Sequence, residues 1–252
     1  MNKQPKILFY DIETSQLNSS NWALDNQNIQ IRSILKEWHI ICISYKWLHE
    51  KKVHNFSLDF DRSITDDYLI CKNIRKVFKE ADVIVGHNAD KFDFKKIMAR
   101  WAYHKIKPLP PILSVDTLKE ARKAFKFTSN KLDYIAQYLK IGAKMETGGL
   151  FLWEECAKGN KKALKKMIKY CDMDVEILQR VYLRMRPFMK NHPNLSTDSE
   201  RINCPKCSSY NKDNWNRRRT NAGILKQQYK CKDCHSYYTL RASEKTKSLT
   251  QS

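Results

Sequence analysis

The sequence lacks any long run of apolar residues. No segment approaches the roughly 18 consecutive apolar residues that a membrane-spanning helix requires, which argues against an integral membrane protein built on such helices. The first six residues are largely polar and lead directly into an apolar stretch, so we expect no secretory signal peptide. We therefore expect a cytoplasmic protein in a reducing compartment, with no membrane partner.

Acidic residues are scarce relative to basic ones. The 252 residues include 47 Lys and Arg but only 27 Asp and Glu, which gives a net charge of +20. Such a balance occurs in generally basic soluble proteins, but it also suits a polyanionic partner, because Lys and Arg neutralise phosphates and release counterions. We favour nucleic acid, DNA before RNA, over an anionic membrane surface. The oligomeric state stays open.

The apolar pattern predicts strands first and alternating strands and helices later. Strands are expected at 6–13, 39–47, 52–58, 81–85 and 114–117. Helices are expected at 63–80, 90–104, 118–125, from 130 onward, and at 160–186. The polar segment 15–37 is expected to be a loop with a short helix. This order favours an α/β fold, with a mixed sheet flanked by helices.

Two acids close the first expected strand. Side chains alternate between the faces of a strand, so Asp11 and Glu13 project from the same side. Adjacent carboxylates repel each other unless a cation lies between them, and the pair is therefore a candidate metal site. The alternative is a strand end whose acids simply face solvent.

A second acid-bearing segment, Gly86 to Asp93, follows a short apolar strand and opens a helix. Asp93 falls in the first turn, where the helix dipole also favours a carboxylate. The alternative is that the segment only caps the helix, through Asn88 or Asp90.

The third segment lies in the last long helix. Tyr170 and Asp174 are four residues apart and share a helix face. Asp172 points elsewhere in this arrangement and is expected to be solvated. A Tyr and an Asp one turn apart often occur by chance. The pair becomes a candidate part of the site because it follows the other two acid-bearing segments in order.

Taken in order, these residues resemble the three motifs of the DEDD exonucleases, RNase H-like proofreading nucleases, over residues 6–186. The tyrosine in the last motif resembles the tyrosine-bearing branch of that family. The resemblance implies that Asp11, Glu13, Asp93 and Asp174 hold two Mg²⁺ or Mn²⁺ ions, with Asp11 as the bridging ligand. It also implies that Tyr170 orients the attacking water.

The stretch 129–139 resembles the exonuclease domains of family B DNA polymerases. No polymerase domain follows it in this sequence, which suggests a stand-alone nuclease. Thr14 and Asn88 stand beside the proposed ligands and are candidate contacts to the substrate end. Hydrogen bonding at a strand end and helix capping are equally good explanations for these two residues.

The eight cysteines divide into two groups. Four are scattered among apolar residues and are expected in the core: Cys42, Cys71, Cys156 and Cys171. The other four form two C-x-x-C knuckles with 23 residues between them: Cys204, Cys207, Cys231 and Cys234. This spacing predicts one structural Zn²⁺ held by four thiolates in a small zinc ribbon. The haem-attachment pattern C-x-x-C-H, ending at His235, is the weaker interpretation because of the second knuckle.

The ribbon region is strongly basic. Between Arg201 and Arg241 there are ten basic residues and two acidic ones, and Arg217, Arg218 and Arg219 are expected near a strand tip. The region resembles the zinc ribbons of some insertion-sequence transposases, which implies nucleic-acid binding through these arginines. A protein-docking ribbon is the alternative.

We therefore expect a nuclease domain at 1–189, a linker at 190–202, a zinc ribbon at 203–240 and a flexible tail at 241–252. The favoured function is a 3′–5′ exonuclease that hydrolyses phosphodiester bonds, preferably of single-stranded DNA. A non-catalytic nucleic-acid-binding protein and a transposase-like strand-transfer enzyme are the competing possibilities.

Overall fold

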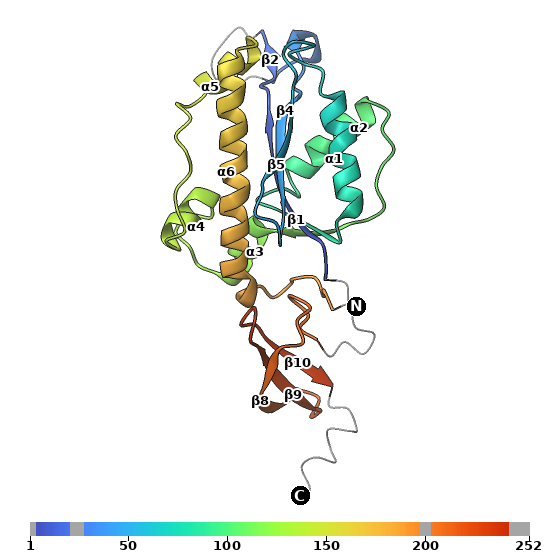
Figure 1. The fold of residues 1–252 in the computed structure, drawn as a ribbon, viewed down its shortest axis with the longest axis vertical. Helices are drawn as coiled ribbons and strands as arrows, with labels where there is room; N and C mark the ends of the chain where they lie inside the picture. Colours follow the sequence, from blue (N-terminus) through green and yellow to red (C-terminus); the bar gives the residue numbers. More distant parts are fainter. Residues whose placement is uncertain (1–3, 21–27, 197–202, 242–252) are drawn as a thin grey trace, which may run out of the picture.

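The computed structural model describes residues 4–20, 28–196 and 203–241. Its larger part is a five-stranded sheet between two layers of helices, as Figure 1 shows. The strands of this sheet are β1 (Ile7–Thr14), β4 (Ile40–Trp47), β5 (His54–Ser57), β6 (Val83–Gly86) and β7 (Leu113–Asp116). The helices are α1 (Tyr68–Glu80), α2 (Asp93–Tyr103), α3 (Thr117–Ala124), α4 (Leu132–Tyr138), α5 (Phe151–Ala157) and α6 (Lys161–Met185).

The sheet is mixed, with strand order β5-β4-β1-β6-β7. β4 pairs antiparallel with β1 and with β5, whereas β6 and β7 run parallel to β1. The predicted mixed sheet flanked by helices is confirmed. All five expected strands are present. The apolar runs of β1, β4 and β6 fit their place in the middle of the sheet, because central strands covered on both faces need apolar residues on both sides.

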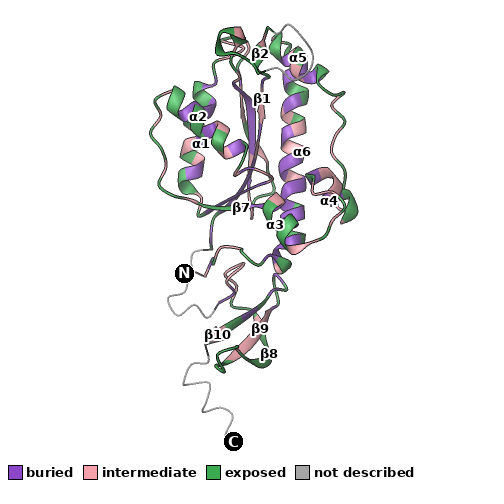
Figure 2. Cartoon of the chain, turned by 180° about the vertical axis from the view of Figure 1, so that it is seen from behind, coloured by how far each residue is buried: buried purple, intermediate pink, exposed green. Residues whose placement is uncertain are grey.

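The alternation along β1 divides the core. Ile7 and Phe9 pack on one face against α4 and α6, and Leu8, Tyr10 and Ile12 pack on the other against α1 and α2. Figure 2 shows the buried residues concentrated in the central strands and along the side of α6 that meets the sheet. Odd-numbered positions of β1 therefore face α6.

Several expected helix starts were wrong. α2 begins at Asp93 rather than near Asp90, because the Asp90 carboxylate accepts hydrogen bonds from Ser114 (2.6 Å) and Lys119 (2.6 Å) and does not cap the helix. α4 begins at Leu132 without a side-chain cap, since Asp133 accepts from the Lys144 backbone N–H instead (2.8 Å).

The segment 15–37, expected as a loop with a short helix, contains the 3₁₀ helix η1 (Ile31–Ser33) in its described part. Its short strand pair, β2 (Asn18–Ser19) with β3 (Ile34–Lys36), was not foreseen. α5 was also missed, because it has only seven residues and Leu150, not a polar capping residue, precedes it.

The smaller part is a three-stranded antiparallel sheet of order β10-β9-β8, made of β8 (Lys212–Arg219), β9 (Leu225–Cys231) and β10 (Tyr237–Arg241). It lies beyond the C-terminal end of α6 and the short 3₁₀ helix η2 (Arg186–Phe188) in Figure 1. Of the expected tail, only Arg241 is described, as the end of β10; the rest lies outside the described residues.

The described residues between η2 and the small sheet are packed against their surroundings. Met189 and Leu195 belong to the buried cluster around α6. The Leu195 backbone N–H donates to the carbonyl of Pro205 (2.7 Å), and Lys206 donates to the carbonyls of Arg186 (3.1 Å) and Pro187 (2.7 Å). Residues 197–202 of the expected linker lie outside the described residues. No helix in the described part of the chain is long and apolar enough to cross a membrane.

Candidate active site and cysteine centre

Three of the predicted acids meet at one point. Carboxylate oxygens of Asp11, Glu13 and Asp174 all lie within 4.8 Å of one another. β1 contributes two of them from the face that meets α6, and α6 contributes the third from its buried side. Alternation in the strand and helical periodicity together produce this convergence.

Asp93 joins the group from the other side of β1. Its Oδ1 accepts a hydrogen bond from the backbone N–H of Ile12 (3.3 Å), the residue between Asp11 and Glu13. The turn before Asp93 depends on Gly86, where an added Cβ would lie 2.3 Å from the Ala89 side chain. This close approach carries the chain from the end of β6 directly to the start of α2.

The acids raise one another's proton affinity. Burial raises the pKa of Asp11 well above its usual range, and the neighbouring Asp93 and Glu13 carboxylates add to it. Burial also raises the pKa of Glu13 to about 8 and that of Asp93 to about 6. Such a cluster is electrostatically unfavourable until positive charge enters it.

Lys144, which the sequence did not single out, supplies part of that charge. Its Nζ forms an ion pair with Asp174 Oδ2 (2.5 Å) and donates to the Tyr170 hydroxyl (3.3 Å). Burial lowers the pKa of Lys144, but the attraction of Asp174 outweighs this and raises it well above its usual value. Nothing in the local sequence distinguishes this lysine, because its partners lie 26 and 30 residues further along the chain.

Tyr170 stays protonated in this environment. Burial and the Asp174 carboxylate raise its pKa to about 12. A phenol with this pKa keeps its proton at neutral pH and is a poor general base, but its hydroxyl remains able to donate a hydrogen bond.

Other expected residues occupy different places. Thr14 faces α2, where its hydroxyl accepts from Lys96 Nζ (3.2 Å). Asn88 has a left-handed backbone (φ 65°) and donates its backbone N–H to Asp116 (2.9 Å). Asn88 also lines a cavity of about 590 Å³ that Lys144 borders.

The expected solvation of Asp172 was wrong. Ser44 donates to its Oδ1 (2.6 Å) and the Asn55 amide lies 3.3 Å from both of its oxygens. Asp172 therefore anchors α6 to β4 and β5, on the sheet face that also carries Asp11, because Ser44 is the cross-strand partner of Asp11.

The cluster of carboxylates fits a divalent cation. Asp174 Oδ1 is buried and has no hydrogen-bond partner among the described residues, although its neighbour Oδ2 is paired with Lys144. A buried oxygen of this kind is costly to leave unpaired. Hard carboxylate oxygens are the ligands that Mg²⁺ and Mn²⁺ prefer.

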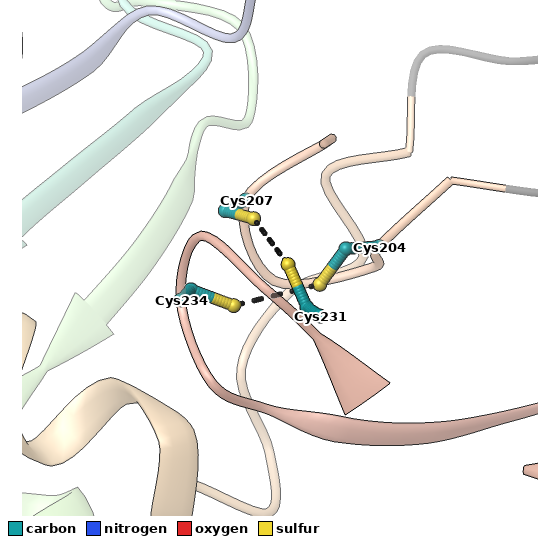
Figure 3. Close-up of side chains that lie close together, drawn as sticks. All are labelled: Cys204, Cys207, Cys231 and Cys234. Carbon is teal, nitrogen blue, oxygen red and sulfur yellow. Dashed lines mark hydrogen bonds between the residues drawn. The ribbon is translucent and has the colours of Figure 1, made fainter. Parts of the chain in front are cut away.

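The four C-terminal cysteines form a second centre, shown in Figure 3. Their sulfur atoms all lie within 4.8 Å of one another, with 3.6 Å between Cys204 and Cys234 and 3.5 Å between Cys207 and Cys231. A tetrahedron with Zn–S bonds of about 2.3 Å has S···S edges of about 3.8 Å. The geometry thus fits one Zn²⁺.

Both knuckles turn in the same way. The residue after the second cysteine of each, Ser208 or His235, has a left-handed backbone (φ 61° and 59°). His235 is exposed, outside the four sulfurs. The arginines Arg217, Arg218 and Arg219 end β8 beside the turn to β9, all exposed.

A family model for the RNase H superfamily matches residues 35–186. The chain belongs to the RNase H superfamily. The match includes Asp93, Tyr170 and Asp174, and it begins after Asp11 and Glu13. Comparison with curated proteins gives no match.

This RNase H superfamily protein is also similar in structure to the family B DNA polymerase from the hyperthermophilic archaeon Pyrobaculum calidifontis. The sequences are 14% identical and the TM-score is 0.53, over 86% of this chain and 31% of the polymerase. At this identity the similarity concerns the fold. The chain spans less than a third of the polymerase's length.

Proposed function

We propose that this protein is a metal-dependent 3′–5′ exonuclease that hydrolyses phosphodiester bonds, with single-stranded DNA as its preferred substrate. The observation that carries the proposal is the meeting of Asp11, Glu13 and Asp174 within 4.8 Å, with Asp93 at its edge. The direction of cleavage rests on the order of the motifs, which resembles that of the DEDD exonucleases. The net charge of +20 supports a nucleic-acid substrate.

In this proposal Asp11, Glu13, Asp93 and Asp174 hold two Mg²⁺ or Mn²⁺ ions. Bound ions of this kind activate a water molecule and stabilise the charge on the leaving oxygen. The Tyr170 hydroxyl orients the attacking water, and Lys144 holds Tyr170 and Asp174 together while offering positive charge to the phosphate. Asn88 and Thr14 are proposed contacts to the terminal nucleotide.

The two parts of the chain have different roles in the proposal. Residues 1–189 form the catalytic unit. Residues 203–240 form a zinc ribbon in which one structural Zn²⁺ is held by the four thiolates of the cysteine centre. The exposed arginines at the end of β8 contact the phosphates of the substrate.

The test is digestion of end-labelled single strands with Mg²⁺ or Mn²⁺, compared with closed circular strands. A ladder of shortened products together with intact circles supports an exonuclease. Nicked or rejoined circles would instead indicate a strand-transfer enzyme, and binding without any cleavage would indicate a non-catalytic protein.

Variants connect the activity to the site. Asp11→Ala and Asp174→Ala should each abolish cleavage while the circular dichroism spectrum stays unchanged, because each removes a proposed ligand. Tyr170→Phe should retain part of the activity, since the ligands remain. Full activity of the Asp11→Ala/Asp174→Ala double variant would refute the assignment.

A further inference from the structure

A groove lies where the nuclease part and the small sheet meet. It has a volume of about 910 Å³ and is lined by residues from both parts. We name it the junction groove and define it by Lys140, Arg180, Arg184, Phe188, His235 and Tyr237. Arg180 and Arg184 come from the last turns of α6, Phe188 from η2, and Tyr237 from β10.

The junction groove is positively charged. Lys140, Arg180 and Arg184 are exposed, and none of them forms an ion pair within the part of the chain that the structure describes. The acid that borders the groove, Asp233, already accepts hydrogen bonds from Ser209 and from Asn211 (2.5 and 2.9 Å). Its charge is therefore partly satisfied, and the groove as a whole suits an anion.

Two aromatic rings stand open beside these cations. Phe188 is 62% exposed and Tyr237 is 49% exposed. Nucleic-acid bases stack on exposed aromatic rings, at about 1–3 kcal/mol per base, while arginines pair with phosphates. Exposed cations and exposed rings that line one groove match the two chemical features of a single strand, its phosphates and its bases, better than those of a folded protein surface.

The groove is in line with the acidic cluster. Arg184 follows Tyr170 by fourteen residues, nearly four complete turns, so both lie on about the same side of α6. Arg184 lies ten residues after Asp174, which at 1.5 Å per residue is about 15 Å along the helix. The loop after α4 joins the two places as well, since it lines the groove at Lys140 and reaches Asp174 through Lys144.

We infer that the junction groove binds the single-stranded part of the substrate on the side away from the end being cut. The inference rests on the proposed function and adds a second contact region to it. At the duplex spacing of about 3.4 Å per phosphate, a distance of 15 Å corresponds to about four nucleotides, which is an upper limit because an extended single strand spaces its phosphates more widely. The groove therefore contacts strands longer than about four nucleotides, whereas a single nucleotide bound at the catalytic centre does not reach it.

The test compares two substrates in the Arg180→Glu/Arg184→Glu variant. One substrate is a 20-nucleotide single strand, and the other is the p-nitrophenyl ester of thymidine 5′-monophosphate, which is too small to reach the groove. We expect KM for the 20-mer to rise at least tenfold, with unchanged hydrolysis of the ester. The slope of log affinity against log salt should fall by about 1.4 for two lost phosphate contacts.

The matched control is Lys72→Glu/Lys76→Glu. These lysines are exposed, lie one turn apart on α1, and belong to the helix layer on the opposite face of the sheet. The control carries the same change of charge as Arg180→Glu/Arg184→Glu. Because its lysines lie away from the groove, we expect it to leave KM and the salt slope of the 20-mer near those of the wild type. Tyr237→Ala should weaken binding of the strand without altering the salt slope, because it removes stacking and no charge.

The results separate this inference from the proposed function. If Arg180→Glu/Arg184→Glu keeps the wild-type KM and salt slope, the junction groove does not bind the strand. An equal rise in KM in the α1 control would refute the inference as well. If the wild type cleaves neither substrate, the proposed activity fails. The groove is then judged by fluorescence anisotropy of a labelled 20-mer, in which unchanged affinity of Arg180→Glu/Arg184→Glu would overturn it.

Discussion

Removing one acid from the cluster should stabilise the metal-free protein and abolish its response to metal. Asp11→Asn removes a negative charge but keeps the shape of the side chain and its acceptor for the weak contact with Cys171 Sγ (3.7 Å). Two like charges at the outer limit of 4.8 Å repel by about 3 kcal/mol at an effective dielectric constant of about 20. Protonation reduces the relief obtained from Glu13, because its raised pKa of about 8 leaves that acid largely protonated at neutral pH.

Divalent metal should also stabilise the wild type, because it neutralises the same clustered charges. A ligand at a hundred times its Kd adds about 2.7 kcal/mol to the free energy of unfolding. For a unit of this size, 1 kcal/mol shifts Tm by about 2–4 °C, so the rise should be about 5–11 °C. The metal-free Asp11→Asn protein should melt at or above the metal-free wild type, and added metal should leave its Tm unchanged.

The assay is differential scanning fluorimetry with and without Mn²⁺, on zinc-loaded protein transferred to zinc-free buffer. Asp172→Asn is the control. It also removes one negative charge, but from α6, at a carboxylate that is bonded to Ser44 and is not one of the proposed ligands. It should keep the full Mn²⁺-dependent rise. An equal rise in Asp11→Asn and the wild type, or no rise in the wild type, would refute the metal site.

Three further outcomes follow from other parts of the structure. Asp67→Ala should lower the free energy of unfolding by about 3–5 kcal/mol in urea titrations, because it leaves the buried Arg100 guanidinium, now paired at 2.6 Å, without its partner; a loss below 1 kcal/mol would show that the pair contributes little. Burial lowers the pKa of His192 to about 4, whereas an unfolded chain titrates near 6.5. The unfolded state therefore binds more protons between these values, and stability should fall as the pH drops from 6.5 to 4, by at most about 3 kcal/mol; a His192→Gln variant with the same pH dependence of urea midpoints would contradict this. Cys207→Ser should reduce bound zinc, measured by atomic absorption, from about one equivalent, and should increase amide exchange in β9 and β10; undiminished zinc would remove this cysteine from the centre.

Much of the fold was predictable because the strong patterns are local. Apolar runs located the central strands, and helical spacing located α6 to within one residue at each end. The Asn160 side chain caps its start, accepting from the N–H groups of Lys162 and Ala163 (3.0 and 3.3 Å). Period-two alternation also explains why Asp11 and Glu13 share a face.

The errors came from contacts that the local sequence does not carry. Asp90 and Asp133 have the residue type that caps helices, but their carboxylates accept hydrogen bonds from Ser114 and from the backbone N–H of Lys144. Lys144 was missed for the same reason. A polar side chain next to a helix has several competing partners, and only the folded chain determines which of them is within reach.

The packed segment between α6 and the small sheet has a consequence for folding cooperativity. Leu195 belongs to the buried cluster around α6, yet its backbone is hydrogen-bonded to Pro205, next to the cysteine centre. Lys206 likewise ties this centre to the carbonyls that follow α6. The two sheets should therefore melt in one transition rather than two, and its midpoint should fall when the thiolates lose their metal. The thermal resistance of the helix that carries Asp174 would then depend on zinc bound at the far end of the chain.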